Sequence, residues 1–220
     1  MSTIKSKTLD EKCRSLPELF VTWKKAHEEG NYRKTFPKNP FDGAEPSDDF
    51  KRSFTWDGCL EKGKTEAEVL FIGRESNVSD KSGKIIGCGE ENDEFWMQKV
   101  YYNEVSGRNT SVYKNYLKKI ASKLGVELKD CAYVNINKRG GYNKCSPERL
   151  EEYIEQYGHF IKREIEIINP KIIVFLGYGR YRYVEKLMSF IDENIKCYMV
   201  YHPSCPGRYK TLCEKLQENI

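Results

Sequence analysis

Four short apolar runs constrain the fold of this chain more than any other feature of its sequence. Each run is rich in branched and aromatic residues and is bounded by turn-forming residues, as is typical of buried strands. The runs cover residues 67–72, 131–136, 171–176 and 197–201. Because the segments between them have helical character, the pattern predicts βαβ units. We therefore expect a three-layer α/β/α fold around a four-stranded, mainly parallel sheet.

The segment before the third run gives the clearest helix signal. Its apolar residues recur every three or four positions, which is the spacing of an amphipathic helix. Ser146 suits the N-cap, Pro147 the first helical position and Glu148 the positive end of the helix dipole, and an Asn-Pro pair at 169–170 ends the helix. Further helices are expected at residues 16–29, 93–102, 111–124 and 180–191, with a last one from about residue 208.

The chain divides into an N-terminal extension and a main domain. We place the main α/β domain at residues 65–220, because the first apolar run lies near its start. Residues 1–64 are expected to form a helical and irregular extension that packs on this domain. Within it, residues 54–58, FTWDG, are expected to form a turn that packs aromatic rings onto the main domain.

Composition and charge restrict the function only weakly. The net charge of +4, from 37 basic and 33 acidic residues, neither requires nor excludes nucleic acid. No segment has the length and apolarity of a membrane span, and the polar N-terminus lacks a signal peptide core, so we expect a cytoplasmic protein. The eight cysteines include no CxxC pair, so we expect free thiols, no metal and no cofactor. Nothing indicates an obligate protein partner, and we expect a monomer.

Polar residues that can do chemistry follow the apolar runs. Glu75 comes shortly after the first run, Asn135 and Asn137 lie at the end of the second, and His202 directly follows the fourth. Right-handed crossovers bring the carboxyl ends of parallel strands to one edge of a sheet, where ligands of open α/β sheets bind. The sequence therefore predicts one site that contains a carboxylate, asparagine amides and a histidine.

Residues 68–214 resemble the uracil-DNA glycosylase superfamily. The resemblance rests on the motif GRESN after the first run, on the asparagine pair NIN, and on IINPKIIVFLG followed by a strand and HPS. The extension with its WDG turn is similar to uncharacterised members of the superfamily more than to its repair enzymes. The resemblance implies a monofunctional DNA glycosylase, which flips a base out of DNA and leaves an abasic site.

The resemblance also implies roles for individual residues. Glu75 would orient the attacking water, with Asn77 beside it, and His202 would stabilise the departing base anion. Asn135 would read the pyrimidine edge, with Asn137 second, Gly73 beside it and Phe95 as a guess for the stacking aromatic. This division suits the reaction, since cleavage leaves positive charge on the sugar and negative charge on the base. The candidate DNA contacts are Lys138, Arg139, Lys144, Arg180, Ser204, Arg208 and Tyr209.

The first motif departs from that of the repair enzymes. Ser76 and Asn77 stand where those members have proline and then tyrosine or glycine. In the uracil enzymes the tyrosine closes the pocket against substituents at pyrimidine C5. The smaller Asn77 therefore suggests a base larger than uracil. Modified cytosines of phage DNA are one such class, and their removal would serve phage defence.

Two other functions fit the same sequence. One is a nucleic-acid-binding protein that has kept the fold and lost catalysis, and the other is a hydrolase of nucleotides or small glycosides. Each candidate residue also has a plain structural interpretation. Glu75 could be a surface carboxylate paired with Arg74 or Arg108, Asn135 could cap a loop, and His202 could be an ordinary loop histidine. The basic segment 137–144 could be a solvated turn.

Overall fold

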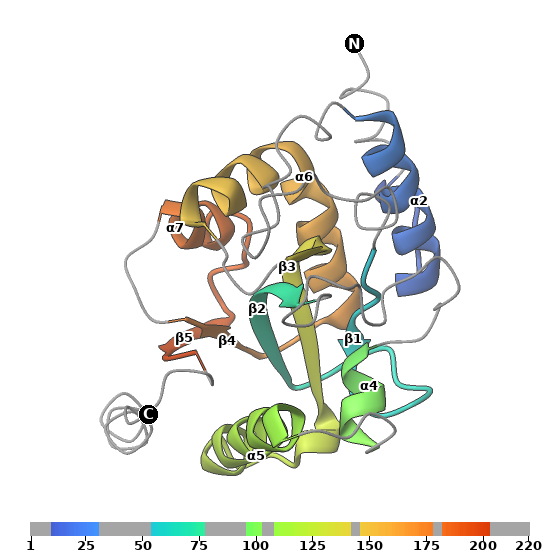
Figure 1. Cartoon of the computed structure of the whole chain (residues 1–220). Coiled ribbons are helices and arrows are strands. Elements are labelled where there is room, and N and C mark those ends of the chain that lie inside the picture. Colours follow the sequence, from blue (N-terminus) through green and yellow to red (C-terminus); the bar gives the residue numbers. More distant parts are fainter. Residues whose placement is uncertain are drawn as a thin grey trace.

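The computed structural model of the chain describes residues 10–30, 54–77, 96–102, 108–141, 146–177 and 182–202. These residues form an α/β protein around a mixed, mostly parallel sheet of order β1-β3-β2-β4-β5 (Figure 1). The strands are β1 (Gly58–Cys59), β2 (Val69–Asn77), β3 (Cys131–Gly141), β4 (Ile172–Leu176) and β5 (Lys196–Val200). The prediction of an α/β fold with a mainly parallel sheet is confirmed, but the sheet has five strands instead of the four predicted. The fifth strand, β1, was not predicted; it is two residues long and pairs antiparallel with β3.

Helices cover both faces of the sheet (Figure 1). The α-helices are α2 (Leu16–Glu29), α4 (Trp96–Tyr101), α5 (Arg108–Lys123), α6 (Pro147–Ile168) and α7 (Arg182–Met188). Helices α2, α6 and α7 share one hydrophobic core with the sheet, and α4 and α5 share a second core with its other face. Ser146 caps α6 as predicted, since its hydroxyl accepts a hydrogen bond from the Arg149 N–H.

The N-terminal segment is continuous with the main fold. Phe20 and Trp23 of α2 are fully buried, and the Trp23 ring stacks on Phe160 of α6 with 5.2 Å between ring centroids. Phe54 packs against the same two rings of α2 and belongs to the core that α2 and α6 share. The segment predicted as an extension thus contributes a helix and the edge strand β1 to the same layers as the rest of the chain.

Strands β2 and β3 run further than their apolar residues predict. The prediction ended them at residues 72 and 136, whereas they extend to Asn77 and Gly141. The two strands pair in parallel, with Glu75 opposite Asn137, and the register shifts between Glu75 and Ser76. Strand pairing provides hydrogen bonds for the backbone N–H and C=O groups of polar and apolar residues alike. A pattern of apolar residues therefore does not show where a strand ends. The extension makes Glu75 and Asn137 direct cross-strand neighbours.

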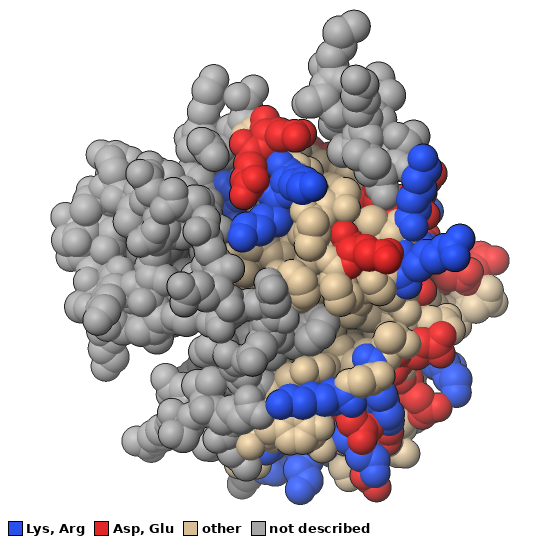
Figure 2. All heavy atoms as spheres, turned by 90° about the vertical axis from the view of Figure 1, so that its right-hand side faces the viewer, with Lys and Arg blue, Asp and Glu red and all other residues tan. Residues whose placement is uncertain are grey.

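The face shown in Figure 2 carries a mixture of charges. Among its described residues, Lys and Arg side chains lie interspersed with Asp and Glu side chains (Figure 2). On the protein surface, Lys64 pairs with Asp130 at 2.7 Å. No helix in the described ranges could cross a membrane. The cysteines that the structure describes, Cys13, Cys59, Cys131 and Cys197, are free thiols.

Candidate functional site

Strand alternation places the predicted site residues on the α5 face of the sheet. Successive side chains of a strand point to opposite faces. In β3, Cys131 and Tyr133 belong to the core beneath α5, whereas Ala132 and Val134 belong to the core beneath α6. Asn135 continues the first set. In β2, Glu75 follows Gly73 by two residues and Phe71 by four. Its side chain therefore points to the same face as Phe71, which lies in the core beneath α5.

Glu75 and Asn137 form a hydrogen-bonded pair across β2 and β3. The Asn137 amide donates to the Glu75 carboxylate with 3.2 Å between Nδ2 and Oε2. The carbonyl oxygen of the same amide accepts from the Arg139 backbone N–H at 3.0 Å, which fixes the amide orientation. Asn137 is buried. Its side chain therefore positions Glu75, and the base contact expected of Asn137 stays a prediction.

Asn135 is held from two sides within β3. Its backbone N–H and its side-chain Nδ2 donate to Asp57 Oδ2, at 2.8 and 3.3 Å. Its carbonyl oxygen accepts from the Tyr133 hydroxyl at 3.3 Å. Asn135 thus lies in a paired strand, and the alternative that it caps a loop is wrong. No sequence pattern indicates the Asp57 contact, because Asp57 and Asn135 are 78 residues apart.

Gly73 provides the room for this arrangement. A Cβ atom at residue 73 would lie 2.2 Å from the Tyr133 hydroxyl oxygen and 2.7 Å from Asn135 Oδ1. Both separations are far below van der Waals contact, so any side chain at this position would displace the two groups. The glycine of the first motif is therefore required by packing against Tyr133 and Asn135.

His202 lies beyond the carboxyl end of β5, against α5. Its ring meets the Tyr113 ring edge-on with 5.8 Å between centroids. The preceding residue is anchored as well, because the Tyr116 hydroxyl donates to the Tyr201 carbonyl at 2.7 Å. Burial, together with the nearby charge of Arg74, lowers the pKa of His202 to about 4. The imidazole is therefore neutral at pH 7 and can donate one N–H without carrying a charge.

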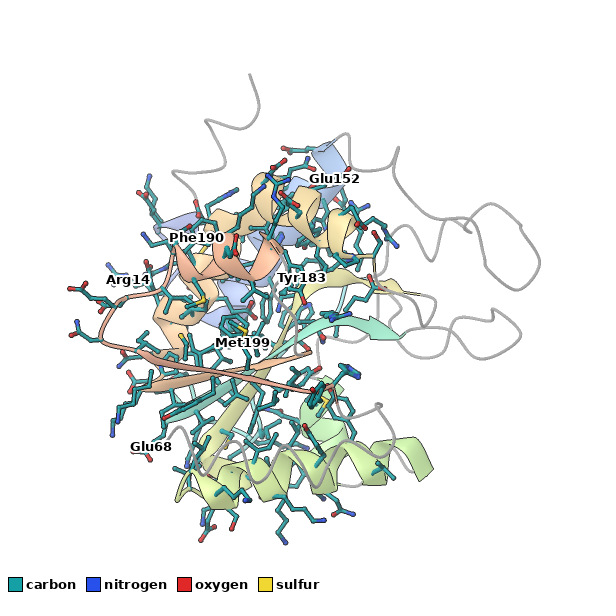
Figure 3. The ribbon with its side chains drawn as sticks, turned by 90° about the vertical axis from the view of Figure 1, so that its left-hand side faces the viewer. Arg14, Glu68, Glu152, Tyr183, Phe190 and Met199 are labelled. Carbon is teal, nitrogen blue, oxygen red and sulfur yellow. The ribbon has the colours of Figure 1, made fainter. Side chains whose placement is uncertain are left out.

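Arg74 occupies the opposite face of β2 from Glu75. Its guanidinium lies over the Tyr183 ring of α7, 6.0 Å from the ring centroid, and Figure 3 shows Tyr183 between α7 and the sheet. Gly177, at the end of β4, has φ +132 and a Cβ there would lie 2.9 Å from Arg74 Nε. The Arg74 guanidinium therefore lies near the carboxyl edge of the sheet, on the face opposite Glu75.

The neutral state of His202 leads to a prediction. In a ¹H NMR titration of the folded protein, the His202 ring resonances should show a midpoint near pH 4, with no change between pH 6 and 7. Replacing Arg74 by glutamine should raise this midpoint toward the ordinary histidine value, because one of its two causes is removed. A midpoint near 6.5 in the unmodified protein would contradict the burial of this ring.

A buried ionic group lies directly behind Asn135. The Lys138 ammonium contacts Asp57 Oδ2 at 3.2 Å and Glu164 Oε1 of α6 at 2.7 Å, and all three side chains are fully buried. The ammonium also lies over the rings of Phe20 and Trp23, 5.3 Å from each centroid. Lys138 was predicted to hold a DNA phosphate, and an exposed fraction of 0% places it out of reach of solvent and DNA. Its charge is used inside the protein.

Arg139 is also directed into the protein. Its exposed fraction is 2%, and it donates to His27 of α2, from Nε to Nδ1 at 3.4 Å and from a guanidinium N–H to the backbone carbonyl at 3.2 Å. His27 Nε2 then donates to the Tyr153 hydroxyl at 2.8 Å. Burial, with the charges of Arg139 and Lys138, lowers the pKa of His27. Arg139 was predicted as a phosphate contact; it instead joins α2 to β3.

Burial raises the pKa of both acids in the ionic group. The pKa of Asp57 lies above its ordinary value, and that of Glu164 is raised to about 7 because desolvation outweighs the attraction of Lys138. One ammonium faces two carboxyl groups, so the group carries a surplus of negative charge when both are ionised. Glu164 consequently holds a proton to a higher pH than an exposed glutamate does.

Glu164 should make folding stability depend on pH. An acid whose pKa is higher in the folded state stabilises the fold at low pH, and this contribution is lost as the pH rises from 4.5 to about 7. The full loss is about 3 kcal/mol, from 1.36 kcal/mol for each pKa unit. The variant Glu164→Gln keeps an acceptor for Lys138 and lacks the titration. Urea unfolding should therefore show this variant gaining stability relative to the unmodified protein between pH 5 and pH 8. An equal difference at both pH values would contradict the raised pKa.

The remaining predicted site residues lie outside the described part of the structure. The backbone of Asn77 is described in β2, opposite Gly141, but its side chain is not. The others are Phe95, Lys144, Arg180, Ser204, Arg208 and Tyr209. Within the described ranges, no group of three or more His, Cys, Asp or Glu side chains is arranged to hold a metal ion.

A comparison of the sequence with protein-family models and with curated proteins gives no match.

Proposed function

We propose that the protein is a DNA glycosylase that hydrolyses the N-glycosidic bond of a flipped-out pyrimidine, either uracil or a C5-modified pyrimidine, and leaves an abasic site. The observation that carries the proposal is the grouping of three chemically different side chains at the carboxyl edge of one sheet. These are the Glu75 carboxylate of β2, the Asn135 amide of β3 and the neutral His202 imidazole beyond β5.

The proposed division of labour follows the charge that develops in the reaction. Breaking the bond leaves positive charge on the sugar and negative charge on the base. The Glu75 carboxylate, oriented by Asn137, would sit near the sugar and align the attacking water. The His202 N–H would donate to the pyrimidine oxygen as it gains charge. A neutral imidazole suits this role, because its N–H can stay hydrogen-bonded to the base anion without transferring its proton.

The base would be selected by shape and by hydrogen bonding. The Asn135 amide offers both a donor and an acceptor to a pyrimidine edge. Since the base must leave the stack before it reaches this edge of the sheet, a good substrate carries a base that is easily unpaired. The proposal retains C5-modified pyrimidines, including modified phage cytosines, because Asn77 replaces a bulkier residue in the first motif.

A panel of DNA duplexes tests the proposal. The full-length protein is incubated with duplexes that contain one uracil, one 5-hydroxymethyluracil, one 5-hydroxymethylcytosine or one glucosylated hydroxymethylcytosine, and with unmodified DNA. Alkali then reveals abasic sites as strand breaks. We expect breaks at one class of modified position. Salt-dependent binding to every duplex with no breaks in any of them would favour the binding protein, and no binding at all would favour a hydrolase of small substrates.

A further inference from the structure

The Arg74 guanidinium is held by two elements that follow β2 in the chain. Its Cζ lies 6.0 Å from the ring centroid of Tyr183, which Figure 3 shows on α7. At the end of β4, a Cβ on Gly177 would lie 2.9 Å from Arg74 Nε, 3.0 Å from Nη2 and 3.2 Å from Cζ. These separations are shorter than ordinary van der Waals contact, so the guanidinium occupies the space that a side chain at residue 177 would need.

The same glycine connects Arg74 to the strand that leads to His202. The Gly177 N–H donates to the Val200 carbonyl at 2.7 Å. Val200 is the last residue of β5, and His202 follows it by two residues. Arg74 and His202 therefore lie at the same carboxyl edge of the sheet. Consistent with this placement, burial and then the charge of Arg74 lower the pKa of His202.

A positive charge at this edge acts in opposite ways on a cation and on an anion. It disfavours the imidazolium form of His202, and it favours a base that departs with the electron pair of the broken bond. Two other ionisable groups belong to this edge among the described residues. Tyr113, in ring contact with His202, stays uncharged because burial raises its pKa. Glu75 projects from the opposite face of β2 to Arg74.

From this geometry we infer that Arg74, held by Gly177 and Tyr183, supplies a fixed positive charge that speeds the departure of the base anion beside His202. The inference rests on the proposed function. Arg74 and Glu75 are neighbours in the GRESN motif, and strand alternation sends them to opposite faces. Their charges are opposite as well, so the motif provides one charge for the sugar and one for the base.

Two substitutions that weaken the charge in different ways test the inference. Arg74→Gln deletes the charge, whereas Gly177→Ala retains it and displaces the guanidinium. Both should raise the midpoint of His202 in a ¹H NMR titration above about 4. At pH 7.5, where His202 stays neutral, both should slow single-turnover excision by about tenfold for each pH unit by which that midpoint rises. The protein concentration at half-saturation should not change, because the charge acts in the transition state.

Three further variants separate the charge from its surroundings. Arg74→Lys keeps a positive charge and should retain most of the excision rate. The double variant Arg74→Gln with Gly177→Ala should match Arg74→Gln alone in midpoint and rate, since the glycine acts through the arginine. Gly125→Ala is the matched control for backbone strain. Gly125 has φ +79, and no atom of the described residues lies within 4 Å of a Cβ placed there. This variant should lose folding stability but keep the midpoint and the rate.

The outcomes distinguish this inference from the proposed function. If the unmodified protein excises a base and Arg74→Gln does so at the same rate, the inference alone is overturned. An unchanged His202 midpoint in Gly177→Ala would overturn it too. So would weaker DNA binding with an unchanged rate at saturation, which would make Arg74 a phosphate contact. If the unmodified protein excises no base, the proposed function fails and the inference fails with it.

Discussion

Replacing Glu75 by glutamine is expected to slow base excision by roughly 100- to 1,000-fold, which is the typical effect of removing one electrostatic contact to a transition state. Glutamine keeps the length of the side chain and an oxygen that accepts from Asn137, so the pairing of β2 with β3 should survive. What is lost is the negative charge opposite the developing positive charge on the sugar. Single-turnover rates on the best substrate of the panel measure the effect.

Glu68 provides the matched control for this variant. It precedes the same strand at the opposite end, where it pairs on the surface with Lys171 at 2.8 Å (Figure 3). Glu68→Gln makes the same chemical change and should leave the excision rate unaltered. Equal losses in both variants would indicate a general electrostatic effect. An unchanged rate in Glu75→Gln would remove Glu75 from the mechanism.

Replacing Lys138 by methionine is expected to cost about 3–5 kcal/mol of folding stability, because it leaves two buried carboxyl groups without their cation. Methionine fills much the same volume, so the packing against Phe20 and Trp23 should change little. The loss should be largest above pH 7, where Glu164 would otherwise be ionised. Urea unfolding at pH 5 and pH 8 measures both effects.

A balanced replacement distinguishes the charge from the packing at this position. The double variant Lys138→Met with Glu164→Leu removes the ion pair as a unit and should recover much of the stability that the single variant loses. Asp57 then remains as an acid that can protonate. If the single and double variants are equally unstable, the loss comes from packing around residue 138 and the ionic explanation is wrong.

The sequence was sufficient to predict the positions of the parallel strands and of the long helix α6. Local signals specify these elements: a short apolar run bounded by turns for each strand, and Ser146 with Pro147 at the start of α6. Once the strands are known, the period of two places Asn135 on the same face as Tyr133. This part of the site follows from the sequence pattern alone.

The buried charges could not be predicted in this way. Lys138 and Arg139 lie in a basic, glycine-rich segment that reads as a solvated loop or a phosphate contact. Their partners are distant in the sequence: Asp57 is 81 residues from Lys138, and His27 is 112 residues from Arg139. No spacing rule connects such pairs, because tertiary packing brings them together. The role of Asp57 in holding Asn135 was missed for the same reason.

Release of a free pyrimidine base from DNA is the measurement that bears most directly on the proposed activity. An excess of the full-length protein is mixed with a duplex that contains one modified pyrimidine, and both the small-molecule fraction and the DNA are analysed by mass spectrometry. Hydrolysis predicts one free base for each abasic site, with an intact DNA backbone before alkali is added. Both products should be absent with Glu75→Gln on the same time scale. A broken backbone without free base, or no reaction with any base of the panel, would contradict the assignment of a DNA glycosylase.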